Sequence, residues 1–378
     1  MGNRMLDTVK NPQDVNAELQ KFRESLRQNV VALAAEMTLR NKMNARKVEA
    51  LCAQIDMSVR EYSTILLRNN TARVAEEAAA ATQADVLDIR RAWGVVSART
   101  NLFRVELNQW NMMRDLVRAQ VMQSRRRVPL YDSRPSEITR SQISASDDVF
   151  DWVHAILNTV KQTEEAREQG GFPDIALPNS KFHRHLHAAY RLLLAKGQTA
   201  RMRFLDVGCG GGLKVLSALR YFKEADGLDF QQSYVDIAQA LLESAGATAS
   251  NAFHADALTF DGYGDYDVIY FYRPIRDQEK IIEMERQIVD QVSEGTILVA
   301  PYVGFGARHA DLGCGRVAGH VYMAKTSQKE ADRWRRMAEQ TGVAVVHSEE
   351  ERVPTIWTPL LEASRQSGYD VKRYVQPV

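Results

Sequence analysis

The sequence predicts an α/β fold, a doubly wound and mostly parallel seven-stranded sheet, preceded by an all-helical region. Three observations support this prediction. A short apolar run of Phe204, Leu205 and Val207 leads into a glycine-rich turn and then into a stretch with apolar residues at helical spacing. Apolar runs and helical stretches then alternate up to about residue 303, which is typical of parallel sheets. Earlier in the chain, residues 13–128 contain no proline and a single glycine, Gly94.

Three regions are expected along the 378 residues. Residues 1–128 form an all-helical module, residues 129–179 a linker with an amphipathic helix, and residues 180–378 the α/β domain. With 45% hydrophobic and 26% charged residues the chain has the composition of a soluble globular protein, and no apolar run is long enough to span a membrane. Three widely spaced cysteines and the absence of a signal-peptide core favour the cytoplasm.

Two patterns in the helical module bear on function. Residues 47–66 fit a helix-turn-helix, with Asp56 at the turn and a capping box of Ser58 and Glu61. Any helical hairpin shares these features, so DNA reading is the less favoured interpretation, and nucleic acid is not the expected partner. A heptad pattern within 72–127 predicts a long helix in a bundle, formed within one chain or across a homodimer. Its main positions are Ile89, Val96, Phe103, Trp110 and Val117.

The glycine loop at 208–212 follows an acid, Asp206, which lies two residues before the first glycine. Glycines let the backbone approach a ligand closely, and the next helix offers free N–H groups. A phosphate loop needs Gly-Lys-Ser/Thr, which the segment 213–215 does not supply. A dinucleotide fingerprint needs a small residue where Leu213 stands, and Asp206 would repel a pyrophosphate. The acid favours a ligand with a cationic amino end, such as S-adenosylmethionine.

Two further acids end the next strands of the predicted sheet. Asp229 closes a strand about twenty residues after the loop, a place from which a carboxylate can accept both ribose hydroxyls of a nucleotide. Phe230 follows it and can lie against an adenine. Asp256 closes a third strand and is followed by Ala257. NAD would also use Asp229, so the case against NAD depends on Asp206, Leu213 and Asp256.

The pattern Asp-x-Gly-x-Gly-x-Gly after a strand, together with the later strand-end acids, resembles class I S-adenosylmethionine-dependent methyltransferases with a Rossmann-like sheet. The resemblance concerns the region from about residue 180 onward. It implies that Asp256 accepts a hydrogen bond from the adenine amino group and that the backbone of Ala257 meets a ring nitrogen. The cofactor-binding residues that it implies are Asp206, Gly208, Cys209, Gly210, Gly212, Asp229, Phe230, Asp256, Ala257 and Tyr272.

The methyl acceptor is expected beyond the fourth strand, which ends near Tyr272. DNA amino-methylating enzymes carry Asn/Asp/Ser-Pro-Pro-aromatic there, and the segment 272–275, Tyr-Arg-Pro-Ile, departs from that pattern. Arg273 pairs either with an anionic substrate or with Asp277 at the start of the next helix. No catalytic residue is assigned; the candidates are Tyr272, Arg273, His309 and His320.

The segment after the fifth strand is rich in glycine, and we expect residues 301–320 to form a flexible lid over the acceptor. His309, Cys314 and His320 within it have irregular spacing for zinc, so no metal is expected. Further strands are expected at 320–324, 343–347 and 370–374.

These observations predict an S-adenosylmethionine-dependent methyltransferase with an unidentified acceptor, a small molecule being favoured over protein or RNA. The N-terminal helices are expected to serve oligomerisation, or the binding of a partner or substrate. The alternative is a DNA-binding or scaffold protein whose methyltransferase fold is inactive. The presence of Asp206, Asp229 and Asp256 argues against an inactive site.

Overall fold

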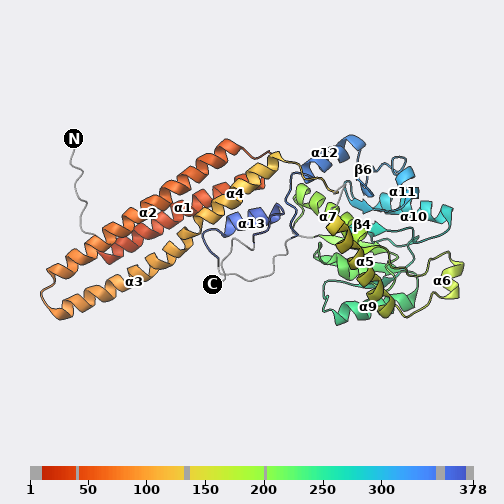
Figure 1. The fold of residues 1–378 in the computed structure, drawn as a ribbon, viewed down its shortest axis with the longest axis horizontal. Coiled ribbons are helices and arrows are strands. Elements are labelled where there is room, and N and C mark those ends of the chain that lie inside the picture. The colour runs from red at the N-terminus through yellow and green to blue at the C-terminus, as the bar shows by residue number, and fades with distance from the viewer. Residues whose placement is uncertain (1–10, 40–41, 132–136, 200–201, 346–353, 372–378) are drawn as a thin grey trace. The chain divides into compact units, whose positions relative to one another are not determined.

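The computed structural model describes residues 11–39, 42–131, 137–199, 202–345 and 354–371 (Figure 1). The chain divides into two compact units. The first comprises Met1–Arg125 and Ser348–Val378 and is helical, and the second comprises Arg126–His347 and contains the sheet. Within the described ranges, no helix is both long enough and apolar enough to cross a membrane.

Polar side chains begin the long helices of the helical unit. Asn11 accepts a hydrogen bond from the N–H of Asp14, and Asn44 accepts bonds from two N–H groups of the next helix. Thr82 forms a reciprocal capping box with Asp85. The helices of this unit are α1 (Pro12–Thr38), α2 (Ala45–Ala79), α3 (Gln83–Asn108), α4 (Trp110–Arg125) and α13 (Thr358–Gln366).

The heptad positions pack inside this unit. Val96, Phe103, Trp110 and Val117 are each at most 7% exposed and belong to one apolar cluster with residues of α1 and α2, and Ile89 is partly buried against that cluster. The pattern therefore packs within one chain. The predicted helix at 72–127 is not continuous, because α2 ends at 79 and the Thr82 cap starts a new helix.

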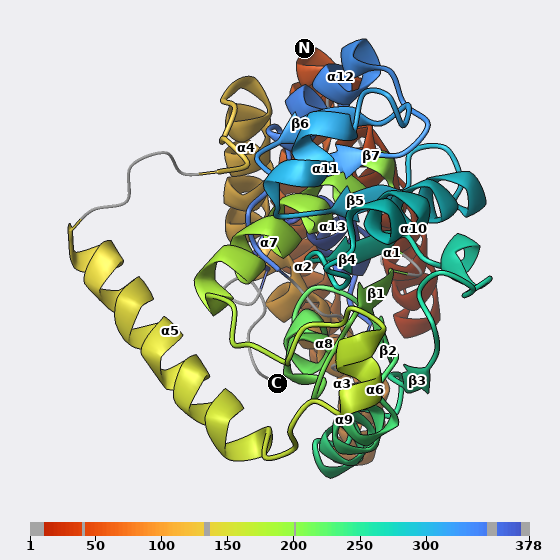
Figure 2. The same cartoon turned by 90° about the vertical axis from the view of Figure 1, so that its right-hand side faces the viewer.

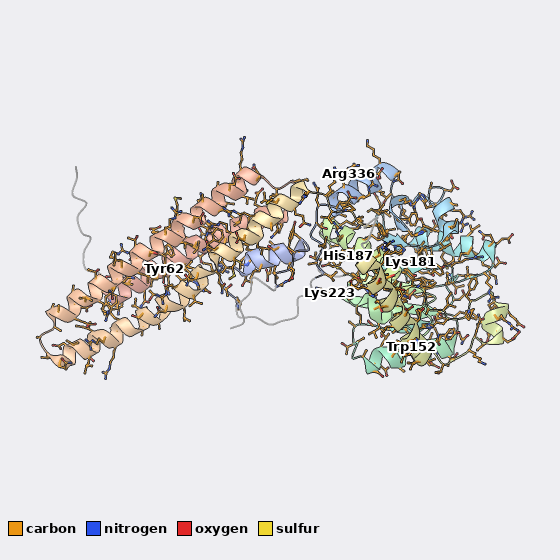
Figure 3. The ribbon with its side chains drawn as sticks, viewed as in Figure 1. Tyr62, Trp152, Lys181, His187, Lys223 and Arg336 are labelled. Carbon is orange, nitrogen blue, oxygen red and sulfur yellow. The ribbon has the colours of Figure 1, made fainter. Side chains whose placement is uncertain are left out.

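The helix-turn-helix prediction for 47–66 is wrong, because α2 runs through the segment without a break. Asp56 does not form a turn; its carboxylate accepts a hydrogen bond of 2.7 Å from the indole N–H of Trp110. The Ser58 hydroxyl donates to the carbonyl of Gln54, one helical turn earlier, and so does not cap a new helix. Tyr62, within the same segment, donates a hydrogen bond to the carbonyl of Thr100 (Figure 3).

The C-terminal segment belongs to the helical unit, so the predicted α/β domain of 180–378 is wrong at its C-terminal end. Trp357 stacks on Trp110 with ring centroids 5.3 Å apart and donates from its indole N–H to the carbonyl of Glu106. Of the strand predicted at 370–374, residues 370–371 are not in a strand, and the other residues lie outside the described ranges.

The second unit is built on a seven-stranded sheet with the order β3-β2-β1-β4-β5-β7-β6. The first five strands in sequence pair in parallel, and β7 pairs antiparallel with both β5 and β6. The predicted doubly wound, mostly parallel sheet is therefore confirmed. The strands are β1 (Arg203–Val207), β2 (Glu224–Asp229), β3 (Ala252–His254), β4 (Val268–Phe271), β5 (Ile297–Val299), β6 (Gly315–Ala318) and β7 (Val321–Met323).

The lid expected at 301–320 is wrong, because β6 lies within it and pairs with β7 in a hairpin. The strand predicted at 320–324 is confirmed as β7. Residues 303–308 form α11, and β6 follows where loop was expected. Gly315 makes this possible, since a Cβ there would lie 2.7 Å from the Cβ of Ala331 on the covering helix α12. The predicted strand at 343–347 is irregular over 343–345, and its last two residues lie outside the described ranges.

Helices cover both faces of this sheet, with α7 and α10 on opposite sides of β4 in Figure 2. Side chains alternate between the faces: Phe204 joins the apolar cluster that includes α7, whereas Leu205 joins the cluster that includes α10. The helices are α5 (Glu137–Leu157), α6 (Glu164–Glu168), α7 (Asn179–Lys196), α8 (Leu213–Ala218), α9 (Gln232–Ser244), α10 (Gln278–Gln291), α11 (Val303–Arg308) and α12 (Gln328–Ala338), with a short 3-10 helix η2 at Tyr263–Asp265.

Candidate functional site

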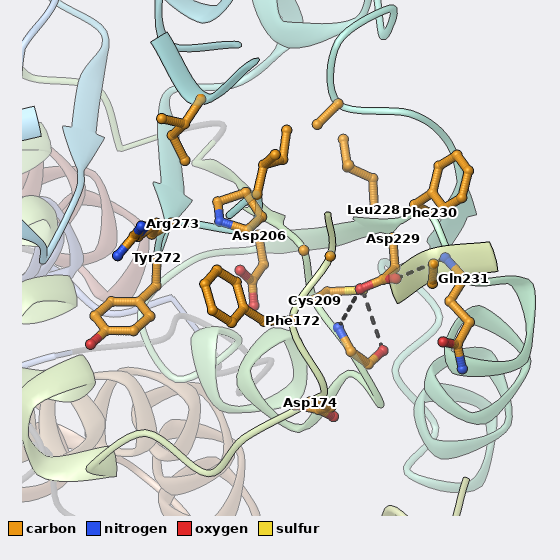
Figure 4. A pocket seen from close by; sticks show the side chains of 18 of the residues that line it. Phe172, Asp174, Asp206, Cys209, Leu228, Asp229, Phe230, Gln231, Tyr272 and Arg273 are labelled. Atoms are coloured by element: carbon orange, nitrogen blue, oxygen red, sulfur yellow. Dashed lines mark hydrogen bonds between the residues drawn. The ribbon is translucent and has the colours of Figure 1, made fainter. Parts of the chain in front are cut away.

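A cavity of about 730 Å³ lies at the carboxyl ends of the parallel strands. It lies beside β1 and β4, the neighbouring strands between which the strand order reverses, and this is where ligands bind in doubly wound sheets. Its volume suits a small-molecule site. Every predicted cofactor residue except Gly212 lines it, so the structure brings together Asp206, Gly208, Cys209, Gly210, Asp229, Phe230, Asp256, Ala257 and Tyr272 (Figure 4).

Three of the four glycines of the loop adopt left-handed backbone angles, with φ of 81° at Gly208, 52° at Gly210 and 80° at Gly212. A Cβ at Gly212 would lie 2.7 Å from the Cβ of Ala238, so this glycine allows close packing of α8 on α9. A Cβ at Gly210 would lie 2.3 Å from the carboxyl carbon of Asp174. Gly212 therefore has a packing role, whereas Gly210 faces the cavity.

Asp229 is held in a fixed orientation at the end of β2. One carboxylate oxygen accepts a hydrogen bond of 2.9 Å from the N–H of Gly210, and the other accepts one of 2.9 Å from the N–H of Gln231 (Figure 4). Burial raises the pKa of Asp229, and these two hydrogen bonds oppose that rise. The second lone pairs of both oxygens remain available for hydroxyl donors.

Asp206 is the most deeply buried acid of the cavity, with 3% of its surface exposed. Burial raises its pKa well above the ordinary value; the charge of Lys214 opposes this rise, and Asp174 and Asp229 add to it. Burial also lowers the pKa of Lys214 to about 8. The ammonium of Lys214 donates to the carbonyl of Leu177 and the side chain of Asn179. Carboxyl groups therefore lie close together at this end of the cavity.

Asp174 completes that cluster, although the sequence places it in a linker. Its carboxylate accepts hydrogen bonds of 2.8 Å from the N–H of Gly211 and 2.6 Å from the side-chain amide of Asn158. The imidazole Nε2 of His154 lies 3.2 Å from its other oxygen. No sequence signal identifies this acid, because residues 174 and 211 meet only in the folded chain.

The segment that carries Asp174 is tied to the start of α10. Gly171 forms an isolated antiparallel bridge with Ile275, and the N–H of Arg276 donates to the carbonyl of Gly170 over 2.7 Å. We call residues 170–177 the strap. Phe172, Asp174, Ile175 and Leu177 from the strap all line the cavity.

The opposite end of the cavity is formed by the residues after β4 and β5. Tyr272, Arg273, Lys280 and Arg308 line it. Arg273 adopts a left-handed backbone angle, φ 46°, which costs a non-glycine residue about 1–2 kcal/mol. Strained residues of this kind concentrate at functional sites.

The candidate histidines are not among the residues that line the cavity. The Nδ1 of His309 lies 2.7 Å from the carbonyl oxygen of Cys314, and its ring packs 5.0 Å from that of Tyr322. The ring of His320 packs 5.6 Å from that of His185. Across the described ranges, no group of three or more His, Cys, Asp or Glu side chains is arranged to hold a metal ion.

Asp206→Asn should stabilise the ligand-free protein at neutral pH. Because the pKa of Asp206 is higher in the folded chain, the folded state binds more protons between the unfolded and folded pKa values, and stability falls as pH rises through that window. Asparagine does not titrate, so the variant lacks this loss of stability with rising pH. The melting temperature of the variant should therefore exceed that of the wild type increasingly as the pH rises from about 4, the ordinary pKa of an aspartate carboxyl, towards neutrality. A difference that stays constant over this range would contradict the assignment.

No family model matches the sequence, and no curated protein matches it. Solved structures that match in part include CalS10, an amino pentose methyltransferase from Micromonospora echinaspora, with 20% identity over 32% of this chain and 50% of that chain, and a TM-score of 0.27. An RNA methyltransferase from Salinibacter ruber, in complex with S-adenosyl-L-homocysteine, matches with 21% identity over 33% of this chain and 76% of that chain, and a TM-score of 0.27.

A putative sarcosine dimethylglycine methyltransferase from Galdieria sulphuraria matches with 14% identity over 42% of this chain and 58% of that chain, and a TM-score of 0.29. The chain spans about half of the length of the first solved structures that it matches. At these identities and TM-scores the similarities give no information about the residues of the site. The order and direction of its own seven strands, with the glycine loop after β1, give the second unit the class I methyltransferase fold.

Proposed function

We propose that this protein is an S-adenosylmethionine-dependent methyltransferase that acts on a small molecule. The observation that carries the proposal is the cluster of three carboxylates, Asp174, Asp206 and Asp229, beside the glycine loop of one cavity. The diphosphate of a dinucleotide would be repelled there. A nucleoside whose other end bears a sulfonium and an ammonium group compensates the negative charge.

The residues of the cavity suit the parts of such a ligand in order. Asp229 is oriented to accept the ribose hydroxyls, and Phe230 lies beside it to cover the adenine (Figure 4). Asp256 and Ala257, beyond β3, are the proposed adenine contacts. Asp206 and Asp174 lie across the glycine loop, where they favour the cationic amino end.

S-adenosylmethionine supplies a methyl group on a positively charged sulfur, so the chain has mainly to position the acceptor in line with it. The strap and α11 line the acceptor end through Phe172, Val303 and Gly304, and a small molecule suits a space bounded in this way. Tyr272 and Arg273 are the proposed acceptor-side residues. His309 and His320 are less suited to act as a base, since neither lines the cavity.

The DNA-binding alternative loses its main support with the helix-turn-helix. We retain partner or substrate binding as the proposed role of the helical unit, whereas its heptad positions give no support to a homodimer because they are buried within one chain. Cys52, Cys209 and Cys314 are unpaired, which is compatible with the proposed cytoplasmic location.

Isothermal calorimetry with S-adenosylhomocysteine and NAD⁺ tests the proposal. The intact protein should bind S-adenosylhomocysteine with a dissociation constant of about 1–50 μM and NAD⁺ at least about fiftyfold more weakly, because only NAD⁺ brings a diphosphate to the carboxylates. No binding of S-adenosylhomocysteine, or tighter binding of NAD⁺, would refute the proposed function.

A further inference from the structure

We infer that the methyl acceptor carries an oxyanion, a carboxylate or a phosphate, that pairs with Arg273. The inference rests on the proposed function and names the chemical class of its acceptor. It depends on the distribution of charge in the cavity, on the partners of the arginines near it, and on the backbone of Arg273.

Charge is segregated along the cavity. The carboxylates of Asp206 and Asp229 come from β1 and β2, whereas Arg273 and Lys280 come from the segment after β4. Figure 4 shows Arg273 and Tyr272 on one side of Asp206, and Asp229 with Phe230 on the other. A cationic cofactor compensates the charge of the carboxylates, and the cationic side chains of Arg273 and Lys280 are left to bind the acceptor.

Arg273 has no acidic partner within the described parts of the chain. Sequence alone allowed an ion pair with Asp277, but the Asp277 carboxylate accepts hydrogen bonds of 2.9 Å from the N–H groups of Glu279 and Lys280 at the start of α10. Arg308 differs, since it forms a two-bonded pair with the buried carboxylate of Glu285. Of these two arginines, Arg273 alone still lacks a carboxylate.

The hydrogen bonds of Arg273 do not explain its strained backbone. Its Nη2 donates to the carbonyl oxygen of Arg276 over 3.5 Å, the outer limit for a hydrogen bond. A glycine would adopt φ 46° without strain, whereas an arginine is disfavoured in this conformation. A role of the arginine side chain in ligand binding accounts for its presence at this position.

Phe172 of the strap lies beneath two guanidinium groups that differ in one respect. Arg273 lies 5.7 Å and Arg276 4.9 Å from the centre of the ring, but of the two only Arg273 lines the cavity. Arg276 is thus a matched control with the same charge and the same aromatic neighbour. Phe172 and Tyr272 also favour aromatic probes at this end of the cavity.

The test measures binding of two matched pairs, benzoate against benzamide and phenyl phosphate against phenol, to protein saturated with S-adenosylhomocysteine. Ligand-detected NMR gives the affinities for the wild type and for Arg273→Gln, Arg273→Lys and Arg276→Gln. At least one anion should bind about tenfold more tightly than its neutral counterpart. The preference should vanish in Arg273→Gln, persist in Arg276→Gln and survive largely in Arg273→Lys.

The two arms separate the sources of the oxyanion, because a preference for benzoate indicates a carboxylate and one for phenyl phosphate indicates a phosphate. Equal binding of anionic and neutral probes overturns the inference, as does an anion preference that Arg273→Gln retains. Calorimetry with S-adenosylhomocysteine alone isolates the proposed function: normal affinity without any anion preference refutes only this inference, and no affinity refutes both.

Discussion

Asp229→Ala should weaken the binding of S-adenosylhomocysteine by more than tenfold. Both carboxylate oxygens are already oriented by the N–H groups of Gly210 and Gln231, so the acid can accept ribose hydroxyls without rearrangement. A hydrogen bond to a charged group contributes about 1.5–3 kcal/mol, which corresponds to about a 10–150-fold change in affinity. Titration calorimetry of the purified variant measures the loss.

Two controls separate the loss of ribose contacts from damage to the loop. Asp236→Ala removes an exposed acid of α9 whose carboxylate accepts a hydrogen bond from Gln232 on the same helix, and the variant should bind like the wild type. Asp229→Asn retains one acceptor oxygen and should give an intermediate affinity. An Asp229→Ala protein that melts normally and binds within twofold of the wild type would contradict the assignment.

The first five strands could be predicted from the sequence because their signals are local. The β1 strand, the glycine loop and α8 follow one another within residues 203–218, and the loop angles depend on glycines at fixed places. The presence of Asp206 and Asp229 in one site could then be predicted from their places at the ends of successive strands, since parallel strands end at one edge of a sheet.

The remaining features depend on contacts between distant residues, which periodicity does not encode. β6 lies in the glycine-rich stretch that suggested a lid, and its place in the sheet depends on antiparallel pairing with β7, the strand predicted at 320–324, across the turn at Gly319. α13 has the pattern of any amphipathic helix, and only its contacts assign it to the helical unit. Asp174 meets the N–H of Gly211 from a stretch of glycine and proline that reads as a helix terminator.

The helix-turn-helix error has a related cause. Asp56 disfavours a helix interior by itself, but Trp110 and Arg114 from α4 supply donors to its carboxylate. Tertiary contacts thus overrode a local preference that is worth only a fraction of a kilocalorie.

Arg191→Met should destabilise the sheet unit by about 3 kcal/mol or more. The guanidinium is 1% exposed and donates to the carbonyl oxygens of Val128, Pro129 and Ala338 over 2.9–3.0 Å, and to the hydroxyl of Thr341 over 3.3 Å. Methionine fills a similar space but leaves these buried acceptors unsatisfied, at about 1–3 kcal/mol each. The melting transition of this unit should fall by roughly 6–12 °C.

Arg184→Met is the matched control, because it removes an exposed arginine from the same helix, α7, and should change the melting temperature by less than about 2 °C. Arg191→Lys keeps the charge near the C-terminal end of α12, where a cation is favoured, but a single nitrogen cannot reach acceptors that three guanidinium nitrogens now share. The melting temperature of Arg191→Lys should lie between those of the wild type and the methionine variant. If lysine restored full stability, charge at the helix end and not the set of hydrogen bonds would be what holds residues 128–129 against α7 and α12.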